Sequence, residues 1–155
     1  MSCYVNFFMR RGEKFFPIGS YSRNHNIFKA FDNYAPWEKI RPLTVMALRQ
    51  IGNECSQMKT ECEHRIEEKE KKKQLVASFN NSVEEKYEVI CDLDDSIDEL
   101  RQERAEEEMA EYFCIFLEAM IDEIRYGESN EEIDPNAYLY VGIEIGNPTL
   151  NDIKE

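Results

Sequence analysis

Apolar and polar residues alternate along the first residues of the chain, with the two-residue period of a β-strand. Val5, Phe7 and Met9 fall on one side of this pattern, and mostly more polar residues lie between them. Gly12 lies in a turn-like segment, and an apolar face continues after it, which predicts a β-hairpin. Pro17 has no backbone N–H to donate, so we expect the second strand to lie at a sheet edge.

A third strand is predicted near the end of the chain. Leu139, Val141 and Ile143 alternate with other residues, as in a strand that is buried on one face. We expect it to pair with the hairpin, because the pattern indicates no other strand. Residues 146–155 are expected to be irregular. Residues 24–42 would form a connector with a short helical turn, and its aromatic side chains, including Trp37, would pack onto the core.

A heptad pattern predicts a long helix that Pro42 opens. Its stripe begins at Leu48 and continues for more than four heptads, with alternating steps of three and four residues. Charged residues occupy the middle of the stripe, so we expect the helix pairing to be weakest there. The predicted stripe comprises Leu48, Ile51, Cys55, Met58, Cys62, Arg65, Lys69, Lys72, Val76 and Phe79.

A second long helix is predicted after a break at residues 80–82. Ser82 and Glu85 have the spacing of a capping box, with Ser82 as the N-cap. We expect the helix to end at Tyr126, with Gly127 as its C-terminal cap. Its stripe would comprise Val83, Ile90, Leu93, Ile97 and Leu100 and then, after a phase shift, Met109, Tyr112, Phe116 and Ala119.

These elements predict an α+β, mainly α fold. Residues 42–127 would form the arm, a long antiparallel coiled-coil hairpin and a single folding unit, because helices joined by a short break fold back on each other. Residues 1–41 and 128–155 would form the head, a small three-stranded, mostly antiparallel sheet with its aromatic connector. With the turn centred on residues 80–81, Lys69 would face Asp92 and help to set the register.

Charge is unevenly distributed along the 155 residues. The whole chain has a formal net charge of -13, yet residues 1–50 hold eight Lys and Arg against three Asp and Glu. A basic head would therefore be joined to an acidic arm. The net charge disfavours non-specific binding to nucleic acid or to anionic membranes. We find no signal peptide and no membrane-spanning stretch, so a cytoplasmic location is expected.

Catalytic and metal-binding patterns are weak in this chain. Its five cysteines include no C-x-x-C pair, and we interpret them as reduced, buried side chains. Glu61 and His64 have a di-metal spacing that occurs once, whereas such sites need it twice. Residues 92–103 resemble a calcium loop but carry Ile97 where that loop needs glycine. We therefore predict no catalytic residue, no cofactor, no metal and no enzymatic activity.

Six consecutive apolar residues, Tyr112 to Leu117, would cover the whole circumference of the second helix. Such a helix must be buried on all sides. Two arrangements satisfy this requirement. Either the head covers the segment completely, or part of the segment is an interface with another subunit.

The pattern favours a protein that works by contact with other proteins. The first hypothesis is a structural or assembly component of a larger complex, such as a viral particle, with self-association into a homo-oligomer as a further option. The alternative is an acidic mimic of nucleic acid that inhibits a nucleic-acid-binding protein. The predicted partner-binding residues of the head are Arg10, Arg11 and Lys14, which cluster at the hairpin turn, where we expect them to be exposed and to stand clear of the apolar face of the sheet. The others are Asp92, Asp94, Asp95, Asp98 and Glu99 in the arm, and Tyr112, Phe113 and Phe116 in the apolar run.

Overall fold

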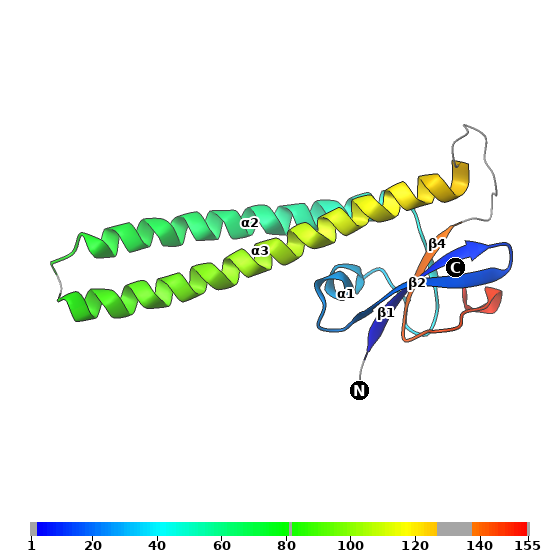
Figure 1. The fold of residues 1–155 in the computed structure, drawn as a ribbon, viewed down its shortest axis with the longest axis horizontal. Coiled ribbons are helices and arrows are strands. Elements are labelled where there is room, and N and C mark those ends of the chain that lie inside the picture. The colour runs from blue at the N-terminus through cyan, green and yellow to red at the C-terminus, as the bar shows by residue number, and fades with distance from the viewer. Residues whose placement is uncertain (1–2, 81, 127–137, 155) are drawn as a thin grey trace. The chain divides into compact units, whose positions relative to one another are not determined.

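A computed structural model describes residues 3–80, 82–126 and 138–154 of the chain. It confirms the mainly helical α+β fold, with two long helices that pack together as a hairpin and a small antiparallel sheet (Figure 1). In chain order the elements are β1 (Tyr4–Arg11), β2 (Lys14–Ser22), α1 (Asn26–Phe31), β3 (Arg41–Leu43), α2 (Val45–Ala77), α3 (Val83–Tyr126), β4 (Leu139–Ile143) and a 3₁₀ turn, η1 (Leu150–Asp152).

The chain divides into two compact units. The sheet unit comprises Met1–Asn53 and Met109–Glu155, and the hairpin unit comprises Glu54–Glu108. Both boundaries lie inside the long helices, so the sheet unit contains the first turns of α2 and the last turns of α3. The sequence pattern placed the boundaries at 41 and 128 instead, and independent folding of residues 42–127 stays a prediction.

The sheet has the strand order β2-β1-β4-β3, and all of its pairs are antiparallel. The hairpin and the C-terminal strand pair as predicted, and Pro17 lies in the edge strand β2. β3 is a fourth strand that the sequence pattern did not indicate. Pro42 belongs to β3, so the prediction that it opens the first helix is wrong. Thr44 caps the start of α2 instead, because its Oγ1 accepts a hydrogen bond from the backbone N–H of Ala47 at 3.0 Å.

Side chains cover both faces of this sheet. β4 is buried along its whole length, which corrects the prediction that it is half-buried. On one face Phe8, Ile40 and Tyr140 form a buried cluster, and Ile145 and Ile153 pack against it. Part of the C-terminal segment therefore packs against the sheet through Ile153, whereas residues 146–149 form no helix or strand, as predicted. Lys154 N–H and Asp152 C=O both hydrogen-bond to the backbone of Ile40 and hold this segment in place.

The connector between β2 and β3 forms the short helix α1. Its three apolar residues Ile27, Phe28 and Phe31 are buried, as predicted, and the Nδ1 of His25 accepts a hydrogen bond from Ile27 N–H as the N-cap. Trp37 is different, because 58% of its surface is exposed. The prediction that Trp37 packs onto the core is wrong. It borders an open depression of about 470 Å³ beside Phe28 and α1.

In the hairpin unit the stripe along α2 differs from a continuous heptad repeat. Met58, Arg65 and Lys72 are exposed, whereas their neighbours Lys59, Ile66 and Lys73 are partly buried beside the buried Cys62. An α-helix has 3.6 residues per turn, so a straight helix moves its contacting row away from a strict seven-residue repeat. On α3, Ile97 and Leu100 are buried as predicted. Ser82 caps α3 as predicted, since its Oγ accepts a hydrogen bond from Glu85 N–H at 3.2 Å. The predicted cap Gly127 lies outside the described residues.

Candidate functional site

Residues 109–121 of α3, all in the sheet unit, carry apolar side chains on two opposite sides of the helix. Ala110, Cys114, Leu117 and Ile121 are buried, at spacings of four, three and four residues. Gly52 of α2 lies beside this row, since a Cβ built at Gly52 would be in ordinary contact with Cys114 Cβ at 3.6 Å. This row holds the end of α3 against the rest of the sheet unit.

The other side of the same helical segment is exposed. Met109, Tyr112, Ile115 and Phe116 keep 55%, 60%, 57% and 56% of their surfaces accessible. Tyr112 and Phe116 are each two residues from Cys114. Two residues correspond to a rotation of about 200° around the helix axis, so these side chains point away from the buried row. We name these four residues the α3 apolar face. Three of the residues predicted for the helix seam, Met109, Tyr112 and Phe116, therefore point away from it, and Ala119 is also exposed.

Phe113 lies between the two sides and packs into the core of the sheet unit. Its ring makes edge-on contacts with Phe7 and Tyr21, at centroid distances of 5.3 and 5.4 Å, and with Phe31 at 6.1 Å. Such contacts add to the stability that burial provides. Phe113 thus anchors α3 to the sheet, while Tyr112 and Phe116, the other two predicted contact residues of the run, remain exposed. The head covers only part of the apolar run.

The α3 apolar face lies in an acidic stretch of sequence. Residues 105–124 include seven Asp and Glu and no Lys or Arg. Glu123 follows Tyr112 by eleven residues, or about three helical turns, so both lie on the same side of the helix. Asp122 and Glu123 are exposed, whereas Glu118 forms an ion pair with Arg49 of α2 at 2.8 Å. Exposed carboxylates therefore lie next to exposed apolar side chains.

The predicted basic cluster at the β1–β2 turn consists of two kinds of residue. Arg11 and Lys14 are exposed, as predicted. Arg10 is half-buried, and its guanidinium donates hydrogen bonds to Gly12 C=O at 2.7 Å and to the Tyr140 hydroxyl at 2.9 Å. It also lies 5.8 Å from the centre of the Phe15 ring. Arg10 therefore braces the turn, and the prediction that it stands clear of the sheet is wrong.

The predicted acidic residues lie on the α3 part of the hairpin unit. Asp94 pairs with Lys73 of α2 at 2.5 Å, and Asp98 lies 3.7 Å from Arg101 of its own helix. Asp92, Asp95 and Glu99 are exposed, with no ion pair among the described residues. The hydrogen bond to Asp94 raises the pKa of Lys73 and so favours its charged form.

Lys69 does not face Asp92, which corrects the predicted register. With the turn centred on residues 80–81, Lys73 would have faced residue 88. In the structure Lys73 pairs with Asp94, six residues further along α3. The ion pair of Glu63 with Arg104 at 2.7 Å shows the same offset, and the ion pair of Glu70 with Arg101 at 3.4 Å is displaced in the same direction by a larger number of residues. Counting residues outward from the turn therefore misplaces the partners.

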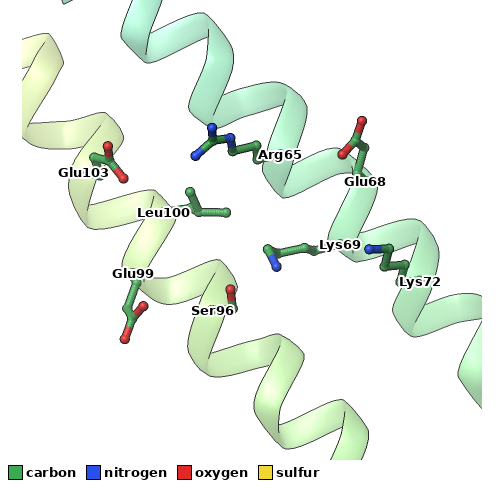
Figure 2. Close-up of a pocket in the computed structure, with 8 residues that line it drawn as sticks. All are labelled: Arg65, Glu68, Lys69, Lys72, Ser96, Glu99, Leu100 and Glu103. Atoms are coloured by element: carbon green, nitrogen blue, oxygen red, sulfur yellow. The ribbon is translucent and has the colours of Figure 1, made fainter.

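Lys69 lines a polar groove on the hairpin unit instead (Figure 2). The groove has a volume of about 420 Å³ and runs between Arg65, Lys69 and Lys72 of α2 and the carboxylates Glu99 and Glu103 of α3. The α2 wall carries these three basic residues and Glu68, yet within the described residues no ion pair of 4.0 Å or less joins Lys69 or Lys72 to the carboxylates of α3. The groove is a charged surface feature with one apolar residue, Leu100, at its base.

All five cysteines are free thiols, and four of them are buried. Burial, with a smaller effect from Glu111, raises the pKa of Cys114 to about 12. Burial also raises the pKa of Cys62. A thiol with a raised pKa is a poor nucleophile at neutral pH. In the described part of the chain, no three His, Cys, Asp or Glu side chains are grouped as metal ligands.

Comparisons with protein-family models, with curated proteins and with solved structures find no match to this chain. Among the described residues, no helix combines the length and the apolar character that crossing a membrane requires. The arrangement of the side chains therefore carries the functional argument.

Proposed function

We propose that this protein is a non-catalytic, protein-binding component of a larger assembly, and that the α3 apolar face is its docking surface. The carrying observation is that α3 presents four large apolar side chains, each more than half exposed, directly opposite its buried row. A helix with two apolar sides needs a partner on each of them. On the basis of the sequence alone, we propose a cytoplasmic complex or a viral particle as the setting.

The size of the α3 apolar face supports a specific contact. Four side chains of this size at 55–60% exposure present roughly 400 Å² of apolar surface. Isolated exposed apolar residues are common on proteins, but four that follow helical spacing on one side are the arrangement a docking helix face has. Arg11 and Lys14 in the sheet unit, and the acidic residues of the hairpin unit, would add charged contacts that steer association.

Photo-cross-linking from the α3 apolar face tests this proposal. A benzophenone amino acid replaces Phe116 in one variant and Tyr87 in the control, because Tyr87 is an aromatic residue of the same helix with 69% exposure. In cells that naturally produce the protein, irradiation should attach one defined protein at position 116 and not at position 87. An absence of adducts at position 116, or the same adducts at both positions, would contradict the proposal.

The exposed carboxylates Asp92, Asp95 and Glu99 favour the second candidate, a mimic of nucleic acid. The hairpin unit holds eighteen Asp and Glu against nine Lys and Arg, which gives it a negative surface that a basic groove could bind. A variant with Asp92→Asn, Asp95→Asn and Glu99→Gln should then lose a salt-sensitive partner that Phe116→Ser retains. The reverse pattern, loss in Phe116→Ser alone, supports the first proposal.

A further inference from the structure

The charges around the α3 apolar face identify the chemistry of its occupant. We infer that this face binds a basic amphipathic helix of another protein, an inference that rests on the docking function proposed above. Such a helix would place apolar side chains on the α3 apolar face and Lys or Arg side chains against the carboxylates beside it. Three features of the face support this assignment: its spacing, its charge and its area.

The spacing of the exposed residues fits a helix as the occupant. Met109, Tyr112 and Phe116 follow one another at steps of three and four residues, and Ile115 lies beside them. Rows with these steps form the ridges that a second helix accepts between its own side chains. From Met109 to Phe116 the row is about 10 Å long, at 1.5 Å per residue, which two to three turns of a docked helix would cover.

The charge around the face selects a basic partner. No Lys or Arg lies between residues 105 and 124 of α3, and Asp122 and Glu123 are exposed at the C-terminal end of the face. An acidic partner would bring like charges together as both surfaces lose water, which costs binding energy. A partner with Lys or Arg beside its apolar row would instead gain charge-assisted contacts and a faster association.

A second copy of this chain is a poor occupant. Two α3 helices packed through this face would bring the exposed carboxylates Asp122 and Glu123 of both copies into the same contact, although Glu108 and Glu118 are paired with basic residues of their own chain. The exposed apolar area, roughly 400 Å², is also about half of the 800 Å² per partner that a standard stable interface buries. A single short helix matches an area of this size better than a whole subunit does.

A set of designed helical peptides tests the inference on the full-length protein. Three peptides of about 18 residues, or five turns, share one Leu-rich face and carry Lys, Gln or Glu beside it. A fourth has the Lys-peptide composition in scrambled order, without an apolar face. Fluorescence anisotropy of labelled peptides gives the affinities, and we expect the Lys peptide to bind at least about tenfold more tightly than the Gln peptide, with no binding of the Glu and scrambled peptides.

Matched variants locate the binding. Phe116→Ser should abolish binding of the Lys peptide, whereas Tyr87→Ser, on the same helix but away from the face, should leave it unchanged. The double variant Asp122→Lys with Glu123→Lys should weaken the Lys peptide at least about fivefold and strengthen the Glu peptide. Thermal unfolding of Tyr87→Ser and of the double variant should match the wild type, because these side chains are exposed. Phe116→Ser should unfold cooperatively with at most a small loss, because its ring also stacks on Phe113 at 6.5 Å.

The outcomes separate this inference from the proposed function. Equal affinity for the Lys and Gln peptides, or tight binding of the scrambled peptide, would overturn the basic-helix assignment and leave the docking function standing. A cross-link at position 116 without binding of any peptide would likewise overturn the basic-helix assignment and leave the docking function standing. A dimer in sedimentation that Phe116→Ser dissociates would identify a second copy as the occupant and also overturn it. Failure of both the cross-link and every peptide would remove the docking function itself.

Discussion

The helices α2 and α3 run through both units, yet different interactions hold them in each. Of the 24 buried hydrophobic residues in the described part of the chain, 20 belong to the sheet unit. The hairpin unit buries Cys55, Cys62, Ile97 and Leu100 and adds ion pairs between its helices, such as Lys73 with Asp94. Burial of large apolar side chains stabilises a fold far more than partly exposed ion pairs do. We therefore expect the hairpin unit to open locally while the sheet unit stays folded.

The largest effect is expected at Gly142 in the centre of the sheet unit. In Gly142→Ala the new Cβ would lie 2.1 Å from the backbone oxygen of Lys39, so a strand or the connector must move. We expect a loss of about 3 kcal/mol or more in the free energy of unfolding, measured by chemical denaturation. Gly146→Ala is the control, because a Cβ at Gly146 meets nothing within 4 Å. Similar losses in both variants would show that the packing around Lys39 is not the cause.

A matched pair of leucines compares the two cores directly. Leu48 in the sheet unit is 1% exposed and Leu100 in the hairpin unit is 8% exposed. We expect Leu48→Ala to cost about 3–5 kcal/mol and Leu100→Ala about 2 kcal/mol, because the cavity at position 100 can fill with water or collapse more easily. Global unfolding by denaturant measures the loss of stability in Leu48→Ala. Helix content, followed by circular dichroism, measures the loss in Leu100→Ala. A larger loss at Leu100 would contradict the proposed difference between the units.

Thiol labelling measures local opening in each unit without destabilising either. At pH 8 in native buffer, Cys62 of the hairpin unit should react with an alkylating reagent faster than Cys114 of the sheet unit, read by mass spectrometry. Burial raises the pKa of both thiols, that of Cys114 to about 12, so each reacts through an opened state. Equal rates for the two thiols would indicate that both units open together.

The raised pKa of Cys114 also predicts a pH dependence of the sheet unit. The folded thiol binds its proton more tightly than the unfolded thiol, whose pKa is about 8.5. The stabilisation of the folded state by the protonated thiol is complete at a pH below the pKa of the unfolded thiol. It is lost as the pH rises towards the pKa of the folded thiol, about 12. The unfolding midpoint should therefore fall more steeply with alkaline pH in the wild type than in Cys114→Ala. Parallel slopes would mean that the thiol stays solvated in the folded state.

The smallest effect is expected from the ion pairs of the hairpin unit. A double-mutant cycle with Lys73→Met and Asp94→Asn should show a small favourable coupling in the unfolding midpoint, because these side chains are in contact. The same cycle with Lys69→Met and Asp92→Asn should show none. Coupling in the second cycle but not in the first would restore the register predicted from the turn centre.

Much of the fold could be predicted from local patterns. The hairpin around Gly12, the edge position of Pro17 and the Ser82 cap each depend on residues close together in the sequence. β3 was not predicted, because its three residues are too few to show the alternation of apolar and polar residues. Pro42 at its centre is also equally typical of a helix start. The packing of the C-terminal segment was not predicted either, since Ile153 becomes partly buried against a cluster that includes Phe8 and Ile40, more than a hundred residues away.

The candidate site shows the same division between local and long-range information. By itself the sequence determined that residues 112–117 of the second long helix are apolar around the whole circumference and that their surroundings are acidic. It could not determine which side would be buried, because Met109, Tyr112 and Phe116 have the same helical spacing as Ala110, Cys114 and Leu117. The tertiary structure decided this. Phe113 packs against the rings of Phe7 and Tyr21, and Cys114 of the buried row lies beside Gly52 of α2, so the row of Met109, Tyr112 and Phe116 is left exposed to solvent.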